Sequence, residues 1–262
     1  MTRMLYPSDL TDEQWRLIQQ RIPPALPGGR HRSVDMREVF NGILYLNRSG
    51  CSWRSLPHDF PPWGTVHYYY RRFRLDGSWK VIHDQLREKT RVAAGKKPTP
   101  SAAVIDSQSV KTTGKRGVRG YDAGKKINGR KRHLIVDTLG LILVVVVHAA
   151  SIQDRDGAKL ALRQLAAGFG RLRLIWADGG YAGQLVAWVA ALGCHWVLQI
   201  VKRNADVKGF KVLPKRWIVE RTFGWLGRYR RHSKDYEALT ESSEAMIRIS
   251  MINLMLHRLK PG

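Results

Sequence analysis

One stretch carries the clearest sign of the architecture: Leu172-Arg173-Leu174-Ile175-Trp176-Ala177-Asp178-Gly179-Gly180-Tyr181. Its first six residues are mostly apolar, which predicts a short buried strand, and Asp178 follows where that strand ends. The next two residues are glycines without side chains, so a bulky partner can come close to the backbone there. A single aspartate at a strand end is more often a turn residue or a helix cap. Its role therefore depends on what the rest of the chain places beside it.

A second short apolar strand is expected at residues 102–105, and it also ends in an aspartate, Asp106. Further elements are expected as follows: a β-hairpin at residues 134–137 and 141–149, helices at 156–167 and 182–192, and a strand at 195–200. Together with a late helix, the order β, β-hairpin, α, β, α, β, α is that of an RNase H-like fold. In that topology the first and fourth strands are neighbours, so Asp106 and Asp178 should lie side by side.

The late helix contains Glu220, the only acid within the strongly basic residues 215–231. One stripe of this helix is suited to a core face and consists of Ile218, Thr222, Trp225 and Tyr229. The opposite row contains Glu220 together with Arg216, Gly224, Gly227 and Arg231. Taken alone, Glu220 is equally well explained by a surface ion pair with Arg216, usually worth under about 1 kcal/mol.

The three carboxylates make chemical sense as a group. Carboxylates at the ends of adjacent strands can bind two Mg²⁺ ions about 3.5–4 Å apart, the arrangement that drives in-line attack on phosphorus. We therefore expect Asp106, Asp178 and Glu220 to be metal ligands and catalytic residues. By contrast, turn or helix-cap roles suit a second set of acids, namely Asp137, Asp154 and Asp156.

The charge balance points to a polyanionic partner. The chain has 45 Lys and Arg residues against 21 Asp and Glu, a formal net charge of +24 over 262 residues. Such a surplus repels itself unless a polyanion binds, so nucleic acid is the leading inference. A membrane surface is the competing reading, but no polybasic segment adjoins an apolar span, and the apolar run at residues 139–150 is too short to cross a bilayer.

The sequence also bears on the cellular compartment. Cys51 and Cys194 are too few and too far apart for a disulfide framework or a zinc site. The first residues lack the apolar core of a signal peptide. We expect a protein of the reducing cytoplasm, associated with the bacterial nucleoid if DNA is its partner.

Residues 1–92 read as a separate all-helical domain, followed by a linker at 93–101. A helix, a turn, a short helix and a basic aromatic helix form a pattern compatible with a helix-turn-helix unit. In that reading Arg71, Arg72 and Arg74 meet DNA. The alternative is a helical cap whose arginines are merely solvated.

The catalytic domain is expected at residues 102–262, with a basic loop at 108–132. Nine of the residues from 111 to 132 are Lys or Arg and only Asp122 is acidic, so this segment could wrap a phosphate backbone. The expected DNA contacts in the loop are Lys115, Arg116, Arg119, Lys125, Lys126, Arg130 and Lys131. Further contacts are expected from Tyr181, Arg216, Arg228 and Arg231. A solvated loop without a specific role is the alternative.

These features together resemble bacterial DDE insertion-sequence transposases, particularly the group called family five, over nearly the whole chain. The motifs are Gly50-Cys51-Ser52-Trp53-Arg54-Ser55-Leu56-Pro57, Ile105-Asp106-Ser107-Gln108-Ser109-Val110, Ala177-Asp178-Gly179-Gly180-Tyr181 and Arg216-Trp217-Ile218-Val219-Glu220-Arg221-Thr222-Phe223. By that match Asp106, Asp178 and Glu220 are the catalytic triad. In the family's final signature Arg216 fits, whereas Leu213 replaces a tyrosine and Gly227 a basic residue. Arg228 or Arg231 is a candidate to replace that missing base.

The resemblance implies an enzyme that binds the terminal inverted repeats of an insertion sequence and cleaves at the element ends. It then joins the 3′-hydroxyls to target DNA, using two Mg²⁺ ions per active site, for which Mn²⁺ substitutes. Because two ends must be held together, a homodimer is expected on double-stranded DNA. A final helix at residues 240–259 is expected either to close the catalytic core or to form part of a dimer contact.

Two other functions remain open on the sequence alone. The first is a nuclease of the same fold that hydrolyses DNA without strand transfer. The second is a non-catalytic DNA-binding repressor derived from a transposase, which would not depend on Asp106 or Asp178.

Overall fold

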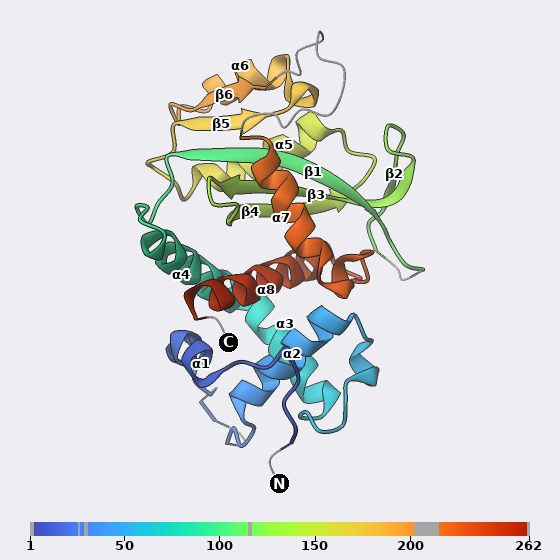
Figure 1. The fold of residues 1–262 in the computed structure, drawn as a ribbon. Coiled ribbons are helices and arrows are strands. Elements are labelled where there is room, and N and C mark those ends of the chain that lie inside the picture. Colours follow the sequence, from blue (N-terminus) through green and yellow to red (C-terminus); the bar gives the residue numbers. More distant parts are fainter. Residues whose placement is uncertain (1–2, 26, 29–30, 115–116, 202–214, 261–262) are drawn as a thin grey trace.

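The computed structural model describes residues 3–25, 27–28, 31–114, 117–201 and 215–260. At its centre lies a six-stranded mixed sheet (Figure 1). The strands are β1 (Ala102–Lys111), β2 (Gly120–Asp122), β3 (Ile127–Asp137), β4 (Ile142–Ala149), β5 (Leu174–Ala177) and β6 (Val197–Ile200). Their order across the sheet is β2-β3-β1-β5-β6, and β4 pairs with β3 beside β2. Because β1, β5 and β6 are parallel and the β3–β4 hairpin is antiparallel, this is the RNase H-like arrangement expected.

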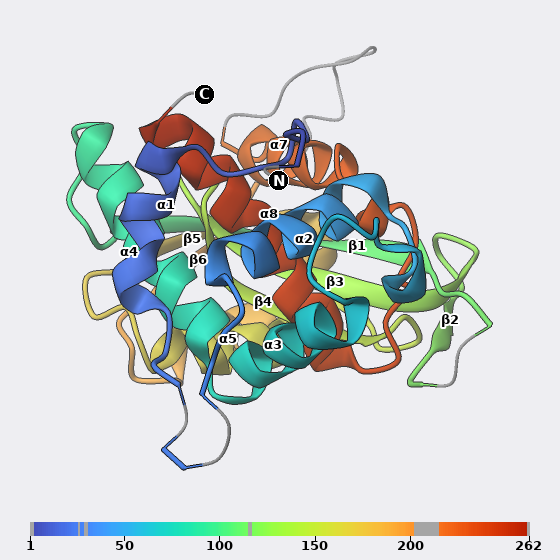
Figure 2. The ribbon, with the colours of Figure 1, turned by 90° about the horizontal axis from the view of Figure 1, so that it is seen from below.

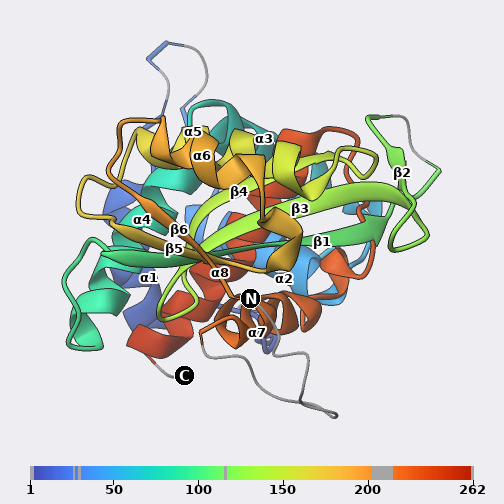
Figure 3. The ribbon, with the colours of Figure 1, turned by 90° about the horizontal axis from the view of Figure 1, so that it is seen from above.

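Helices cover both faces of the sheet. The helices α5 (Asp154–Ala166) and α6 (Gln184–Ala190) lie on one face, and α7 (Trp217–Gly227) and α8 (Thr240–Leu259) lie on the other (Figure 3). Alternate residues of a strand point to opposite faces. Accordingly, Ala103 and Ile105 belong to the core beneath α5 and α6, while Val104 belongs to the core beneath α7 and α8.

The N-terminal part is helical, as expected. It contains α1 (Asp12–Ile18), α2 (Met36–Ser49), α3 (Trp63–Leu75) and α4 (Ser78–Ala93), with short 3₁₀ turns η1 (Gln19–Arg21) and η2 (Trp53–Ser55). Thr11 forms a capping box at the start of α1, with Gln14 as its reciprocal partner. Asp35 caps α2, and α3 begins at Trp63, directly after Pro62.

Two further short turns complete the chain, η3 (Gly179–Tyr181) and η4 (Arg230–His232). The N-terminal helices pack against α8, which lies between them and the sheet (Figures 1 and 2). Side chains of α2, α3, α4, α8 and β4 share one hydrophobic core. The predicted linker joins α4 to β1, and it is tied down, because the Ser101 carbonyl accepts hydrogen bonds from the backbone of Arg173 and Leu174. The division into two domains at this point stays a prediction.

The prediction that residues 108–132 form a basic loop is wrong for much of this segment. Strand β1 continues to Lys111 and β3 begins at Ile127, so much of the segment is paired sheet. The physical reason lies in acids elsewhere in the chain. Buried carboxylates neutralise the basic side chains that point into the protein, as Asp235 does for Arg130, and this lets a basic sequence form an interior strand.

Candidate active site

The pairing of β1 with β5 brings Asp106 and Asp178 together. Asp106 does not end its strand as expected, because β1 continues to Lys111 through its pairing with β3, whereas Asp178 directly follows β5. The strands are parallel, with Ala102 opposite Leu174 and Val104 opposite Trp176. Asp106 and Asp178 each lie two residues beyond the last of these pairs. The two carboxylates therefore leave the sheet at the same point, as the topology predicted.

Asp106 is held in a setting that disfavours its charge. Burial raises its pKa to about 6, and the charge of Asp178 adds to that rise. The Ser107 backbone N–H, which donates to Asp106 Oδ1 at 2.7 Å, and the charges of Lys125 and Arg216 act in the opposite direction. The elevated pKa is therefore mainly an effect of burial, to which the charge of Asp178 adds.

Asp178 has a structural role as well. Its Oδ1 accepts the Gly180 backbone N–H at 2.9 Å and so caps the turn η3. The cap fixes the direction in which the carboxylate leaves β5. The helix-cap reading of a lone strand-end aspartate is thus correct for Asp178, and it is compatible with a place in the site.

Glu220 reaches the same region from the first turn of α7. Its Oε1 accepts from the Arg216 guanidinium at 2.7 Å, so the expected ion pair exists. Burial lowers the pKa of Arg216, but the hydrogen bond and charge of Glu220, together with the charges of Asp178 and Asp106, raise it overall. Arg216 therefore lies within electrostatic reach of all three carboxylates.

The carboxylates of Asp106, Asp178 and Glu220 do not lie together as one set of metal ligands. Among the described residues, no three His, Cys, Asp or Glu side chains are grouped so that they could hold a metal ion. Asp106 and Asp178 stand together, whereas Glu220 points its carboxylate at Arg216 with half of its side chain exposed. A site that used all three carboxylates would require Glu220 to turn away from that arginine.

The donor set nevertheless fits a hard divalent cation. Mg²⁺ is commonly bound through one or two carboxylates, with waters and substrate phosphates completing its octahedron. Asp106 and Asp178 supply two such carboxylates, and a bound cation would favour the ionised form of Asp106, which burial and the charge of Asp178 disfavour. Oxygen ligands of this kind suit Mg²⁺ and Mn²⁺ alike.

A polar network behind Asp106 was not expected from the sequence. Asp154 accepts the Ser107 hydroxyl at 2.8 Å and pairs with Lys131 at 2.9 Å. Burial alone would raise the pKa of Asp154, but the hydrogen bonds from Lys131 and Ser107 lower it. Lys125 also reaches the Ser107 carbonyl, at 3.2 Å. The sequence did contain a signal, namely an acid shortly after the second hairpin strand, yet it was read as a helix-start residue, which it also is.

The surface around the carboxylates is open. A β-carbon built on Gly179, Gly224 or Gly227 would meet nothing within 4 Å, and on Gly180 it would meet only the Asp178 carboxylate. The stripe of α7 expected to face the core is indeed turned inward, with Ile218, Thr222 and Tyr229 buried and Trp225 partly so. The glycine row consequently faces outward beside Glu220.

Four of the expected DNA contacts are not available at the surface. They are Arg130 (1% exposed), Lys131 (4%), Tyr181 (1%) and Arg231 (5%). Arg130 pairs with Asp235 at 3.1 Å, Lys131 pairs with Asp154, and Arg231 pairs with Glu237 at 2.6 Å. The structure thus corrects the prediction for these four, whose polar groups are enclosed within the protein.

The other expected contacts differ in position. Those exposed to solvent are Arg71, Arg119, Lys125, Lys126 and Arg228, and those partly buried are Arg72, Arg74 and Arg216. Lys115 and Arg116 lie outside the described residues, as does Leu213 of the family signature. Of the two arginines considered as replacements for the missing base of that signature, the exposed Arg228 is available for a ligand and the paired Arg231 is not.

Taken together, an RNase H-like sheet that places Asp106 of β1 beside Asp178, directly after β5, is typical of a nucleic-acid-processing enzyme. The comparisons with known proteins agree. Residues 97–256 match the family model described as "Transposase DDE domain". Residues 10–83 match the model described as "Putative transposase of IS4/5 family". The chain belongs to the DDE transposases of the IS4/5 type.

Individual proteins are similar to parts of the chain. An "Insertion element IS402 uncharacterized 16.2 kDa protein" of Burkholderia cepacia is 31% identical over 112 residues, which make up 40% of this chain and 74% of the relative. Among solved structures, the "Drosophila P element transposase strand transfer complex" is similar over 73% of this chain and 45% of that chain. The identity there is 14% and the TM-score 0.34.

Within the described residues, no helix is both long enough and apolar enough to span a bilayer.

Proposed function

We propose that this transposase binds the terminal inverted repeats of an insertion sequence, cleaves at the element ends and joins the freed 3′-hydroxyls to target DNA. Asp106, Asp178 and Glu220 would hold the divalent ions, Mg²⁺ or Mn²⁺, that the chemistry needs. The observation that carries this proposal is the parallel register of β1 and β5, which places Asp106 beside Asp178. Helix α7 adds Glu220 and Arg216 next to them.

The bound ions and the protein's own residues would have different roles in the reaction. When bound, divalent ions would activate the attacking oxygen and stabilise the leaving oxygen at phosphorus. The protein's own part is to orient carboxylates, through the Gly180 backbone N–H at Asp178 and the Ser107 backbone N–H at Asp106. Arg216 pairs with Glu220 until that carboxylate turns to a metal ion, and its positive charge offsets part of the repulsion among the carboxylates.

The open glycines support DNA as the substrate. The exposed positions at Gly179, Gly224 and Gly227 leave the carboxylates approachable by a bulky strand. The exposed cations Arg119, Lys125 and Arg228 would contact its phosphates. Because two element ends must be cut and joined in concert, we expect a homodimer on DNA, in the bacterial cytoplasm and associated with the nucleoid.

The test compares single neutral variants of the site with a matched control. We expect Asp106→Asn, Asp178→Asn and Glu220→Gln each to lower cleavage and joining by about a thousandfold, equivalent to about 4 kcal/mol of stabilisation at the reacting phosphate. Asp156→Asn is the control, because Asp156 is an exposed acid whose partner is Lys159 on the same helix. The measurement uses a labelled terminal-repeat duplex, a plasmid target and Mg²⁺.

The same assay separates the two alternatives. Nicked ends without joined product in the wild-type protein would indicate the nuclease. Full activity in all three variants would contradict the proposal, and unchanged DNA binding with no cleavage under any condition would favour the repressor.

A further inference from the structure

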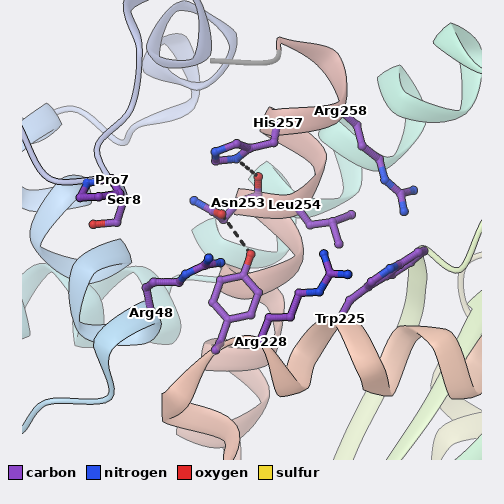
Figure 4. A pocket seen from close by; sticks show the side chains of 10 residues that line it. Pro7, Ser8, Arg48, Trp225, Arg228, Asn253, Leu254, His257 and Arg258 are labelled. Atoms are coloured by element: carbon purple, nitrogen blue, oxygen red, sulfur yellow. Dashed lines mark hydrogen bonds between the residues drawn. The ribbon is translucent and has the colours of Figure 1, made fainter.

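A pocket lies at the junction of the N-terminal helices with α7 and α8, near the C-terminal end of α7, whereas Glu220 lies in the first turn of that helix. It has a volume of about 380 Å³, within the range of small-ligand sites. Its lining comes from segments far apart in the sequence, as Figure 4 shows: Pro7, Ser8, Arg48, Trp225, Arg228, Tyr229, Asn253, Leu254, His257 and Arg258. No step of the proposed reaction uses this pocket.

The pocket concentrates positive charge. Arg48, Arg228 and Arg258 line it together with His257, and no acidic side chain is among its lining residues within the described part of the chain. A neighbouring arginine, Arg221, adds to the charge by lying over the same Trp225 ring as Arg258. Burial and the charge of Arg221 lower the pKa of Arg258, while the charge of Asp137 acts in the opposite direction.

Two of the three arginines, Arg48 and Arg258, lie over aromatic rings. The Arg258 guanidinium lies 4.3 Å from the centroid of Trp225, and that of Arg48 lies 5.6 Å from the centroid of Tyr229. A guanidinium over a ring gains cation–π attraction while its N–H groups stay free to donate at the edge. The Tyr229 ring is itself fixed, since its hydroxyl donates to Asn253 Oδ1 at 3.0 Å (Figure 4). The donors are thus oriented before any ligand arrives.

Each arginine also lies at the C-terminal end of a helix. Arg48 is in the last turn of α2, Arg228 caps α7 and Arg258 is in the last turn of α8. The negative end of a helix dipole stabilises a cation there. The three helix ends therefore offset part of the electrostatic repulsion among the three arginines that surround the pocket.

Arginines around a pocket without acidic lining residues are suited to binding a phosphate group, because the planar fork of guanidinium N–H donors matches the phosphate oxygens. We propose that this pocket binds a phosphate through Arg48, Arg228 and Arg258, and that the phosphate belongs to the DNA held along α7. The identity of the ligand as DNA rests on the proposed function, whereas the phosphate chemistry does not.

The position of the pocket supports DNA as the source. Arg228 lies eight residues after Glu220, at the end of the same helix. At 1.5 Å per residue the two are about 12 Å apart along the axis, comparable with three to four base steps of about 3.4 Å. A strand with its reacting phosphate at Glu220 would bring a later phosphate to the pocket. The pocket would also link DNA binding to α2, since Arg48 comes from the N-terminal part.

The first experiment uses inorganic phosphate as the probe. Sodium phosphate should raise the melting temperature of the full chain more than sodium chloride of equal ionic strength, and calorimetry should detect binding. In the double variant Arg48→Gln/Arg258→Gln both effects should disappear. The control is Arg163→Gln, which removes an arginine from over Trp188, a similar pairing on α5 at the opposite face of the sheet. An equal response in wild type, double variant and control would overturn the proposal.

The second experiment identifies the source of the phosphate. Duplex binding is measured in EDTA, so that an inactive catalytic centre cannot influence the result. We expect the double variant to bind about tenfold more weakly at about 0.1 M salt, with the slope of log K against log salt reduced by about 0.9 because one phosphate is no longer neutralised. The Arg163→Gln protein should match wild type. Loss of inorganic phosphate binding with unchanged duplex binding would assign the pocket to a free phosphate compound and overturn DNA as its ligand.

A third measurement locates the phosphate. Duplexes carrying a single neutral methylphosphonate should reveal one position whose neutralisation weakens wild-type binding and leaves the double variant unaffected. Failure of the proposed function would appear elsewhere, as cleavage that does not depend on Asp106. The two results are therefore independent.

Discussion

Asp106 shows how a buried carboxylate lowers stability. Its carboxyl lies within strand β1 beside Asp178, and its pKa is raised from 3.8 to about 6. In the unfolded chain the group ionises near 3.8, so at about pH 8 folding must bury a charge that the unfolded state exposes to water. Below about pH 4 both states are protonated and the penalty disappears.

We therefore predict that Asp106→Asn stabilises the metal-free protein at high pH. The gain should approach about 3 kcal/mol at about pH 8, at roughly 1.36 kcal/mol per pKa unit, shrink as the pH falls through about 6 and vanish near about pH 4. Urea unfolding in EDTA across this pH range measures it, with Asp156→Asn as the control. A gain independent of pH would mean that charge burial is not its cause.

Among the elements, β3 departs most from what its sequence suggests. It carries Arg130, Lys131 and Arg132 in succession, yet all three are buried. Arg130 donates to Asp235, to the Ser243 hydroxyl and to the carbonyls of Val118, Glu237 and Ala238. Those partners belong to the segment before β2, the connection between α7 and α8, and the first turn of α8. Arg130 thus fixes the connection that leads from α7 to α8.

We predict that Arg130→Met lowers the free energy of unfolding by about 3–5 kcal/mol, because Asp235 would remain buried without its cation. The control is Arg119→Met, which removes an exposed arginine of the same basic segment and should change stability by less than about 0.5 kcal/mol. Denaturant unfolding measures both. Equal, small effects would show that the buried network contributes little.

For the whole molecule, the net charge of +24 acts through the cations that stay exposed. Lys125 and Lys126 are exposed at the turn before β3, whereas Lys131 on that strand is paired with Asp154. Only exposed cations can replace counterions along DNA. The number of basic residues in the sequence therefore overstates the number of phosphates that the protein can neutralise.

We predict that Lys125→Gln/Lys126→Gln weakens duplex binding and reduces the salt slope by up to about 1.8, or about 0.9 for each phosphate that is no longer neutralised. Lys131→Gln should destabilise the fold and leave the slope of the folded protein unchanged. Fluorescence anisotropy across a salt series distinguishes the two. An unchanged slope in the double variant would show that this turn does not touch phosphates.

Local pattern was sufficient for much of the architecture. The apolar strand before Asp178, the hairpin and the inward stripe of α7 follow from the sequence, because period and turn chemistry act within a few residues. The strand expected to end at Asp106 instead continues to Lys111, because its pairing with β3 extends it. The order of these elements then implied the RNase H-like sheet. The adjacency of the two aspartates followed from that order.

Only the tertiary structure decided which basic residues are free. Arg130 is neutralised by Asp235, 105 residues away, and the pocket joins Arg48 to Arg258 from opposite ends of the chain. Pairing and burial depend on such distant neighbours, so no local pattern separates an arginine that binds phosphate from one that anchors the core. The sequence by itself determined that Asp106 and Asp178 lie side by side, because strand order follows from the succession of the elements along the chain. The tertiary structure determined which basic side chains remain free to bind DNA. A basic side chain is neutralised by acids that lie close to it in space, and these acids can be distant in the sequence.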